Sequence, residues 1–241
     1  MNNLNKKHNL NQQNQKRNLR NLTQKKKRRK KRKLANLKLE QEILSQGYER
    51  IVGIDEVGRG AWAGPVVVGA FEYFPEQQEY NGVRDSKLLK IDERELLVQK
   101  LQLHPHIIEE GSVESINSQG LGKTIEELIS NIVQTYDKKT FFLIDGQFAQ
   151  NFTKRSLKVI KGDMKHYSIA CASNLAKVYR DNLMKELHLA YPEFGFESNV
   201  GYPSLYHRKA LETHGPTKIH RASFKPIAEM LNQYSLGISY E

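Results

Sequence analysis

The chain has 241 residues, of which 38% are hydrophobic, so it can bury one large core or two small ones. Residues 1–39 hold 15 Lys and Arg and no acid, so the total charge of +11 leaves about −4 on the other 202 residues. No apolar run is long enough to predict a transmembrane helix, and a single cysteine, Cys171, excludes a disulfide within the chain. These features favour a reducing compartment, and we expect the protein in the cytoplasm.

Residues 1–45 are expected to form a basic, disordered tail that leads into a short helix. Residues 25–33 are nine consecutive cations, and such a block repels itself and stays disordered in isolation. The tail could contact phosphates, act as a targeting signal, or be a solvated segment with no specific task. Between Leu34 and Gln46, leucines recur among charged residues, which predicts a helix that ends at Gly47.

The stretch from Ile51 to Pro65 is the most informative part of the chain. A short apolar run, typical of a buried strand, ends in two adjacent carboxylates, Asp55 and Glu56. The turn Gly58-Arg59-Gly60 follows at once, and Gly64-Pro65 stand a few residues further on. Glycines in a turn let the backbone approach a ligand closely. Acids beside such a loop indicate metal-assisted chemistry on a phosphodiester.

The elements that follow alternate between strands and helices. The β-branched and aromatic stretch Pro65–Tyr73 predicts a second strand, and its short connection favours an antiparallel neighbour of the first. Asp92 is predicted to cap a helix, with Glu95 three residues later. Residues 106–113 predict a third strand. Residues 124–136 predict a helix, because their apolar residues fall on one continuous stripe.

A second apolar run, Thr140–Gly146, repeats the design of the first strand and carries Asp145 at its end. Adjacent strands lie ~4.8 Å apart, so acids at matching strand ends can share a metal ion. An isolated Asp-Gly pair would indicate only a turn, but the repeated pattern favours a metal site. Residues 157–161 predict a last strand, which Gly162-Asp163 ends, and residues 168–189 predict a long helix. This order indicates an α/β mixed sheet, antiparallel at the start and parallel later.

The motifs together resemble ribonuclease HII, the type 2 ribonuclease H family, over about residues 50–228. The signature is a strand ending in Asp-Glu, then Gly-Arg-Gly, then Gly-Pro. Further matches stand at Arg84–Lys87, Lys161–Asp163, Ser168–Asp181, Gly201-Tyr202 and His220–Phe224. The resemblance implies a ribonuclease H-like mixed sheet flanked by helices, with a helical C-terminal extension, in a catalytic domain over residues 46–241.

The resemblance also implies the site residues. The catalytic residues and metal ligands are expected to be Asp55, Glu56, Asp145 and Asp163. Their hard oxygen ligands suit two Mg²⁺ or Mn²⁺ ions, and the sequence leaves the preferred ion open. The substrate-binding residues are expected to be Gly58, Arg59, Gly60, Lys87 and Tyr202. Lys87 would approach a phosphate, and Tyr202 would pack on the sugar that follows the ribonucleotide. Taken singly, these two residues are more typical of a surface loop and of a core or rim aromatic.

Asp181 competes with Asp163 as the fourth acid. Asp181 stands about 18 residues further on within the long helix, roughly 27 Å along a straight helix. If that helix begins beside the site, the distance takes Asp181 away from it. An ion pair with Arg180 or another neighbour would account for Asp181, whereas the Lys-Gly-Asp element of the family matches Asp163.

The family's reaction is hydrolysis of RNA in an RNA–DNA hybrid, or of a single ribonucleotide in duplex DNA. Cleavage on the 5′ side of the ribonucleotide leaves a 5′-phosphate and a 3′-hydroxyl. One ion would activate the attacking water, and the other would stabilise the leaving oxygen. A ribonuclease HIII-like enzyme, which handles single ribonucleotides poorly, is the closest alternative. A non-catalytic nucleic-acid-binding protein is disfavoured, because four carboxylates would repel phosphate without a metal.

The remaining features yield expectations about packing and partners. Cys171 is expected to be an inert small residue in an apolar setting. His207, His214 and His220 fit no standard metal-ligand spacing and are expected to be structural or rim histidines. The expected partners are RNA–DNA hybrids and ribonucleotide-containing DNA, with no membrane, and the chain is expected to be a monomer. Residues 233–236 weakly resemble a sliding-clamp peptide, although such a tetrapeptide also occurs by chance.

Overall fold

The computed structural model describes residues 35–83 and 86–235, with side chains up to residue 233. The nine-cation block, Arg84-Asp85 and residues 236–241 lie outside the described residues. Expectations about the basic tail and about the clamp-like peptide at residues 233–236 therefore stay predictions. The same holds for the first half of the Arg84–Lys87 motif.

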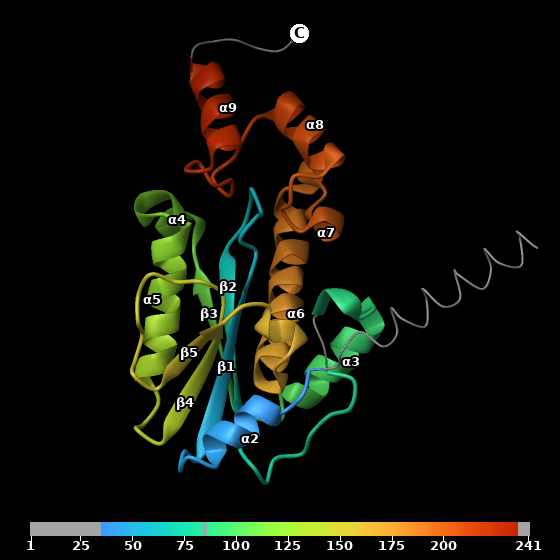
Figure 1. The fold of residues 1–241 in the computed structure, drawn as a ribbon. Coiled ribbons are helices and arrows are strands. Elements are labelled where there is room, and N and C mark those ends of the chain that lie inside the picture. Colours follow the sequence, from blue (N-terminus) through green and yellow to red (C-terminus); the bar gives the residue numbers. More distant parts are fainter. Residues whose placement is uncertain (1–34, 84–85, 236–241) are drawn as a thin grey trace, which may run out of the picture. The chain divides into compact units, whose positions relative to one another are not determined.

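A five-stranded mixed sheet forms the centre of the described body, with the strand order β3-β2-β1-β4-β5 (Figure 1). β1 pairs antiparallel with β2 and parallel with β4. β3 extends the antiparallel side and β5 extends the parallel side. The predicted mixed sheet is therefore confirmed. The strands are β1 (Arg50–Val57), β2 (Val66–Tyr73), β3 (His106–Gly111), β4 (Thr140–Asp145) and β5 (Ser156–Val159).

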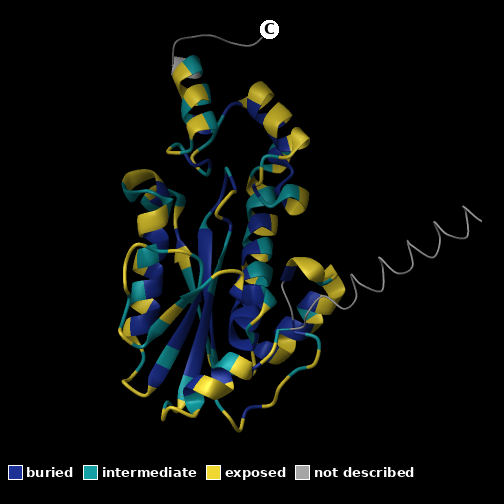
Figure 2. Ribbon diagram, in the orientation of Figure 1, coloured by how far each residue is buried: buried dark blue, intermediate teal, exposed yellow. Residues whose placement is uncertain are grey.

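Helices cover both faces of this sheet. α5 lies against one face, and α6 with α3 lies against the other (Figure 1). The sides of these helices that face the sheet are buried (Figure 2). The α-helices are α2 (Lys38–Leu44), α3 (Ile91–Leu101), α4 (Val113–Gln119), α5 (Leu121–Gln134), α6 (Tyr167–Ala190), α7 (Phe196–Asn199), α8 (Leu205–His214) and α9 (Lys225–Ser235). Short 3₁₀ helices are η1 (Ser86–Leu88), η2 (Gly162–Met164) and η3 (Pro192–Phe194).

The apolar stripe predicted for residues 124–136 forms the core on the α5 side. Ile125, Ile129 and Ile132 are fully buried against Val52 of β1 and Phe142 of β4. The helix itself begins at Leu121, three residues earlier than predicted, and ends at Gln134, two residues earlier than predicted. The stripe was visible in the sequence because it repeats with the helical period, whereas the ends of a helix depend on local capping.

α6 lies unusually close to the sheet because glycines on two strands leave room for it. A Cβ atom at Gly53 would lie 2.2 Å from the backbone carbon of Ser168. A Cβ atom at Gly69 would lie 2.6 Å from the carbonyl oxygen of Ala172. The small residues at the start of α6 meet these glycines, and Cys171 is buried among them as predicted. The close approach brings Ser173 and Lys177 of α6 to the cleft described below.

α2 differs from the predicted helix and has a packing role. It ends at Leu44 with Ser45 as the C-cap, whereas Gly47 (φ 97°) lies in the turn beyond it. Glu40 is fully buried and accepts hydrogen bonds from the backbone N–H and the hydroxyl of Ser168, both at 3.0 Å. A carboxylate at the N-terminus of a helix satisfies donors that the helix cannot. α2 therefore stabilises the start of α6.

The start of α3 was predicted wrongly. The helix begins at Ile91, with Lys90 as the N-cap residue, and Asp92 lies inside its first turn. The N–H of Lys90 donates to Oε2 of Glu93 at 3.3 Å. Acidic residues are favoured throughout the first turn of a helix, so Asp92 alone does not show at which residue the helix begins. α4 was not predicted; its start is capped by Ser112, whose hydroxyl accepts from the N–H of Ser115.

The predicted helical C-terminal extension is confirmed. The segments α7, α8 and α9 follow α6 and enclose a separate apolar cluster that includes Met184, Phe194, Phe196, Leu211 and Ile227. Ala63, from the loop between β1 and β2, belongs to the same cluster. The C-terminal helices therefore pack against the loop that carries the Gly58-Arg59-Gly60 turn.

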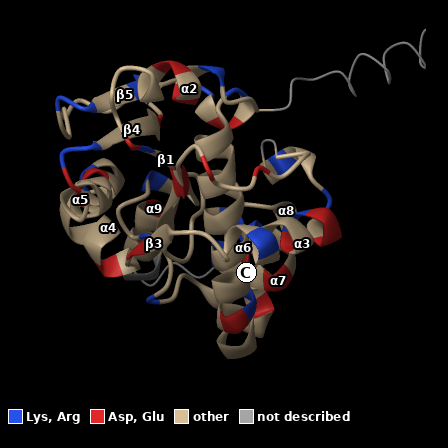
Figure 3. Ribbon diagram, turned by 90° about the horizontal axis from the view of Figure 1, so that it is seen from below, with Lys and Arg blue, Asp and Glu red and all other residues tan. Residues whose placement is uncertain are grey.

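Charged residues of both signs are interspersed on the surface of the described residues, for example on α2 and α3 (Figure 3). Among residues 35–83 and 86–235, no helix combines the length and the hydropathy that crossing a membrane would need.

Candidate active site

Three aspartates meet at the C-terminal ends of the central strands. Parallel register pairs Ile54 of β1 with Ile144 of β4, so Asp55 and Asp145 follow side by side. Asp163 lies on η2, and its N–H donates to Oδ2 of Asp145 at 3.5 Å. One carboxylate oxygen from each of these three residues lies within 4.8 Å of the others. The structure thus gathers three of the four predicted acids at one point.

The electrostatics of this cluster fit a divalent cation. Desolvation raises the pKa of Asp55 well above its usual range, and the nearby charges of Glu56, Asp145 and Asp163 raise it further. A hydrogen bond from Ser173 opposes the shift. Close carboxylates disfavour one another's ionised form, and a hard cation with oxygen ligands would offset that repulsion. The donor set at this point is therefore suited to Mg²⁺ or Mn²⁺.

Glu56 stands beside the cluster without being one of its three members. Its Oε1 accepts from Nη1 of Arg59 at 3.3 Å, an ion pair across the turn. Desolvation raises the pKa of Glu56; Arg59 lowers it, and Asp145 raises it. All four acids were predicted to share one site, whereas in the structure the carboxylate of Glu56 is paired with Arg59. Glu56 lines the same cleft as the three aspartates.

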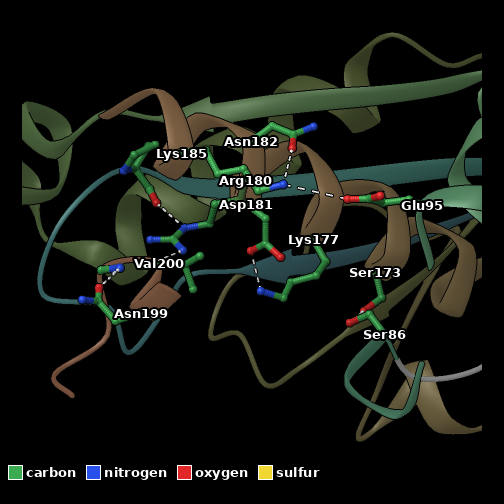
Figure 4. Close-up of polar contacts among 12 residues, drawn as sticks. Ser86, Glu95, Ser173, Lys177, Arg180, Asp181, Asn182, Lys185, Asn199 and Val200 are labelled. Carbon is green, nitrogen blue, oxygen red and sulfur yellow. Dashed lines mark hydrogen bonds and ion pairs between the residues drawn. The ribbon is translucent and has the colours of Figure 1, made fainter. Parts of the chain in front are cut away.

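The cluster lies on the wall of a cleft of about 720 Å³. Every residue predicted for the site from sequence lines this cleft: Asp55, Glu56, Gly58, Arg59, Gly60, Lys87, Asp145, Asp163 and Tyr202. The cleft is also lined by residues that were not predicted to belong to the site: Val57, Ser86, Gly146, Ile160, Lys161, Met164, Ser173, Lys177 and Val200. Ser86 and Ser173 lie 3.3 Å apart through their hydroxyls (Figure 4). That contact joins η1, which carries Lys87, to α6.

Asp181 lies away from the aspartate cluster. Its carboxylate forms an ion pair with Lys177, one helical turn earlier on α6 (Figure 4). It lines a smaller pocket of about 220 Å³ between α3, α6 and α7. The expected ion pair with a neighbour is present, although the partner is Lys177 and not Arg180.

The turn after β1 depends on its first glycine. Gly58 has φ 94°, a conformation that residues with a Cβ atom rarely adopt. A Cβ atom there would also lie 2.3 Å from Nε of Arg180. Gly60 lies near Tyr202, since a Cβ atom on Gly60 would be 3.6 Å from the tyrosine ring. The turn and the tyrosine, 142 residues apart in the chain, therefore form one wall of the cleft.

Two fully buried arginines, Arg180 and Arg221, hold this wall, and neither was predicted from the sequence to do so. Arg180 donates to the carbonyl oxygens of Pro65, Val200 and Ala63 at 2.9, 2.8 and 3.2 Å. Arg221 donates to four carbonyl groups of the loop between β1 and β2, those of Gly58, Arg59, Gly64 and Pro65, and it shares Pro65 with Arg180. Burial lowers the pKa of both guanidinium groups. An arginine in a short motif is as typical of an exposed substrate-binding residue as of a buried one, so the sequence did not indicate that these two are buried.

Tyr202 is 36% exposed, and the centre of its ring lies 5.8 Å from the guanidinium carbon of Arg180. Its carbonyl oxygen lies 2.9 Å from Nδ1 of His207, and Nε2 of His207 lies 3.1 Å from Nε2 of His220. Both histidines are buried among aromatic rings of the C-terminal extension. Their burial and their contact with each other confirm the structural role expected of His207 and His220.

The fold is shared with solved type 2 ribonucleases H. The chain is similar to the ribonuclease H2 from Pyrococcus horikoshii, with 23% identity, a TM-score of 0.64, and coverage of 77% of this chain and 99% of that one. It is similar to the ribonuclease HII in a PCNA complex from Archaeoglobus fulgidus, with 22% identity, a TM-score of 0.61, and coverage of 73% and 95%. A Bst ribonuclease HIII bound to Mn²⁺ has 19% identity and a TM-score of 0.55, with coverage of 77% and 70%.

The sequence comparisons identify the family. The family model described as Ribonuclease HII matches residues 52–227. The ribonuclease HII of Chlamydia trachomatis serovar A is 40% identical over 198 residues, which cover 80% of this chain and 90% of that protein. The ribonuclease HII of Desulfotalea psychrophila is 37% identical over 207 residues, covering 82% and 90%. Fold, acid cluster and relatives define a ribonuclease H-type endonuclease, a phosphodiester hydrolase. The chain belongs to the ribonuclease HII family.

Proposed function

We propose that this endonuclease hydrolyses the RNA strand of RNA–DNA hybrids and single ribonucleotides embedded in duplex DNA. The cut falls on the 5′ side of the ribonucleotide and leaves a 5′-phosphate and a 3′-hydroxyl. The observation that carries the proposal is the cluster of Asp55, Asp145 and Asp163, whose oxygens meet within 4.8 Å in the same cleft as the glycine turn and Tyr202.

Asp55, Asp145 and Asp163, joined by Glu56, would hold two Mg²⁺ or Mn²⁺ ions. Such ions, when bound, activate a water molecule and stabilise the leaving 3′ oxygen. By holding the cations, these carboxylates would fix where the substrate phosphate can lie in the cleft. Glu56 would have to leave Arg59 to join the three aspartates, and substrate phosphate offers Arg59 an alternative partner.

The wall formed by the glycine turn and Tyr202 would select the ribonucleotide. The turn Gly58-Arg59-Gly60, in which Arg59 and Gly60 are exposed, would bring its backbone against the 2′-hydroxyl, the group that distinguishes RNA from DNA. Tyr202 would pack on the next sugar, which must lack that hydroxyl for close contact. Lys87, which lines the cleft and is exposed, would contact a phosphate.

We further propose that the enzyme is a monomer that acts in the cytoplasm; the single cysteine, Cys171, is free, as is usual in a reducing compartment. The relative from Archaeoglobus fulgidus is named as a complex with PCNA, and residues 233–236 are a candidate for a comparable weak contact. We also propose that the basic N-terminal segment, with its nine-cation block, precedes the catalytic domain, and that α2 belongs to that domain because Glu40 bonds to Ser168.

Purified protein should be incubated with a labelled DNA duplex that contains one ribonucleotide, in Mg²⁺ or Mn²⁺, and the cut mapped. The same duplex without the ribonucleotide is the control. We expect one cut on the 5′ side of the ribonucleotide and none in the control. A cut elsewhere, or none with either ion, would contradict the proposal. Cleavage of an all-RNA strand but not of the single ribonucleotide would favour ribonuclease HIII-like activity.

A further inference from the structure

Arg221 is a buried cation whose bonds go entirely to one loop. The residue is fully buried, and its guanidinium donates to the carbonyl oxygens of Gly58 at 2.7 Å, Gly64 at 3.0 Å, Pro65 at 3.0 Å and Arg59 at 3.2 Å. Among the described residues, no carboxylate forms an ion pair with it. Burying a charge is costly unless hydrogen bonds compensate, so these four carbonyl groups are what keep Arg221 in place.

The two carbonyl groups nearest the catalytic acids determine where neighbouring N–H groups point. A trans peptide unit is planar, and its C=O and N–H bonds point in opposite directions. The carbonyl groups of Gly58 and Arg59 are turned toward Arg221 in the interior. The N–H groups of Arg59 and Gly60 belong to the same two peptide units and therefore point the other way.

That direction leads into the cleft. Arg59 and Gly60 are exposed and line the cleft that contains the aspartate cluster. Neither of their N–H groups donates to another of the described residues. Two adjacent donors, held outward by a buried arginine and unused within the protein, form a receptor for an oxygen atom.

We propose that Arg221 is the positioning residue that turns the N–H groups of Arg59 and Gly60 into the cleft, where they donate to the 2′-oxygen of the ribonucleotide. The inference rests on the proposed function, because it takes a ribonucleotide as the ligand. Arg221 itself does not touch the substrate. It acts through four carbonyl groups, and its effect is confined to the recognition of the 2′-hydroxyl.

Arg180 is a matched control within the same chain. It is equally buried, and it also donates only to backbone carbonyl groups of this region. Its acceptors are Ala63, Pro65 and Val200, so it does not orient the peptide units that follow Gly58 and Arg59. Loss of Arg180 should therefore weaken the wall of the cleft without abolishing the preference for a 2′-hydroxyl.

The test compares wild type, Arg221→Lys and Arg180→Lys, since lysine keeps the charge but cannot reach four acceptors. Binding is measured by fluorescence anisotropy in EDTA, with a DNA duplex that contains one ribonucleotide and with the same duplex in all-DNA form. We expect wild type to prefer the ribonucleotide by roughly three- to tenfold, as for one or two net hydrogen bonds. Arg221→Lys should lower the ratio to about 1 with unchanged all-DNA affinity, and Arg180→Lys should retain it.

The outcomes separate the two proposals. If Arg221→Lys keeps the wild-type ratio, the positioning role of Arg221 is wrong while the proposed function stands. If wild type itself shows no preference and no cleavage in Mg²⁺ or Mn²⁺, both are wrong. Should Arg221→Lys fail to fold, amide NMR of wild type decides. The Arg59 and Gly60 resonances must shift more with the ribonucleotide duplex than with the all-DNA duplex, and equal shifts would overturn the inference.

Discussion

Nε2 of His207 lies 3.1 Å from Nε2 of His220, so one imidazole must donate a hydrogen to the other. The N–H of Thr217 donates to Nδ1 of His220 at 2.9 Å, which places the hydrogen of His220 on Nε2. His207 then accepts at Nε2 and carries its own hydrogen on Nδ1, where the carbonyl oxygen of Tyr202 accepts it at 2.9 Å. The chain of bonds works only while both rings are neutral.

Stability should therefore fall as the pH drops. Burial, with His207 nearby, lowers the pKa of His220 to about 4, and burial also lowers that of His207. The unfolded chain takes up these protons near pH 6.5, so it binds more protons between pH 6.5 and 4 and stability is lost across that window. His220 alone should account for on the order of 2 kcal/mol between pH 7 and 5.

Thermal melts of wild type and His220→Gln at several pH values between 7.5 and 5 would measure this. The variant should be less stable at pH 7.5 but should show a shallower pH slope. His214→Gln, at an exposed histidine of the same extension, is the control and should keep the wild-type slope. Equal slopes for all three proteins would contradict the assignment.

Asp55→Asn should nearly abolish cleavage yet stabilise the protein in EDTA. Removing one charge from the cluster weakens the binding of a cation that stabilises developing charge, which should lower the rate by two or more orders of magnitude, on the order of 10²–10³. The same change removes a buried charge and its repulsion with the nearby carboxylates, the two causes that raise the pKa of Asp55, so it should stabilise the metal-free protein. Melts with and without Mn²⁺ should show a metal-dependent rise for wild type that the variant lacks. A wild-type rate in Asp55→Asn would refute the metal site.

Asp163→Asn and Asp181→Asn should have different effects, although both acids lie within the residues that match the family model. Asp163 belongs to the carboxylate cluster, so its replacement should cut activity by about tenfold or more. Asp181 pairs with Lys177, and its replacement should act mainly on stability, by less than about 1 kcal/mol because the pair is partly exposed. Steady-state rates with melting temperatures distinguish the two. A dead but folded Asp181→Asn beside an active Asp163→Asn would reverse the assignment.

Tyr202→Ala should change where the enzyme cuts more than whether it cuts. The ring forms one wall of the cleft beside Gly60, and a sugar without a 2′-hydroxyl can pack on it closely. Cleavage at an RNA–DNA junction should fall more than cleavage of an all-RNA strand. Tyr202→Phe retains the ring and should retain the ratio. An equal loss on both substrates would show that Tyr202 does not read the junction.

Removal of residues 1–34 should leave an active body with weaker and less salt-dependent binding to nucleic acid. The truncation stops before Leu37, which is buried in the core, so the fold should persist. The slope of log K against log salt scales with the phosphates neutralised, at roughly −0.9 per contact on duplex DNA. Titrations at several salt concentrations would reveal the change. An unchanged slope would mean that the basic segment does not touch nucleic acid.

The sequence by itself determined the features that repeat locally. The apolar runs that end at Asp55 and Asp145 predicted two buried strands with acids at matching ends, and their parallel pairing follows from the order of elements. The stripe of α5 followed from the helical period. The nine predicted site residues all line one cleft, but the roles expected of Lys87 and Tyr202 came from the family resemblance and not from local pattern.

How those residues are held depends on contacts that only the folded chain brings together. Arg221 bonds to Gly58 across 163 positions, and the His207–His220 pair joins two rings whose contact the sequence did not predict. The carboxylate of Glu56 forms an ion pair with Arg59, although the adjacent residue Asp55 belongs to the aspartate cluster. Periodicity and motif spacing report local conformation, but such contacts depend on which side chains the folded core brings together, and on the need of each buried polar group for a partner.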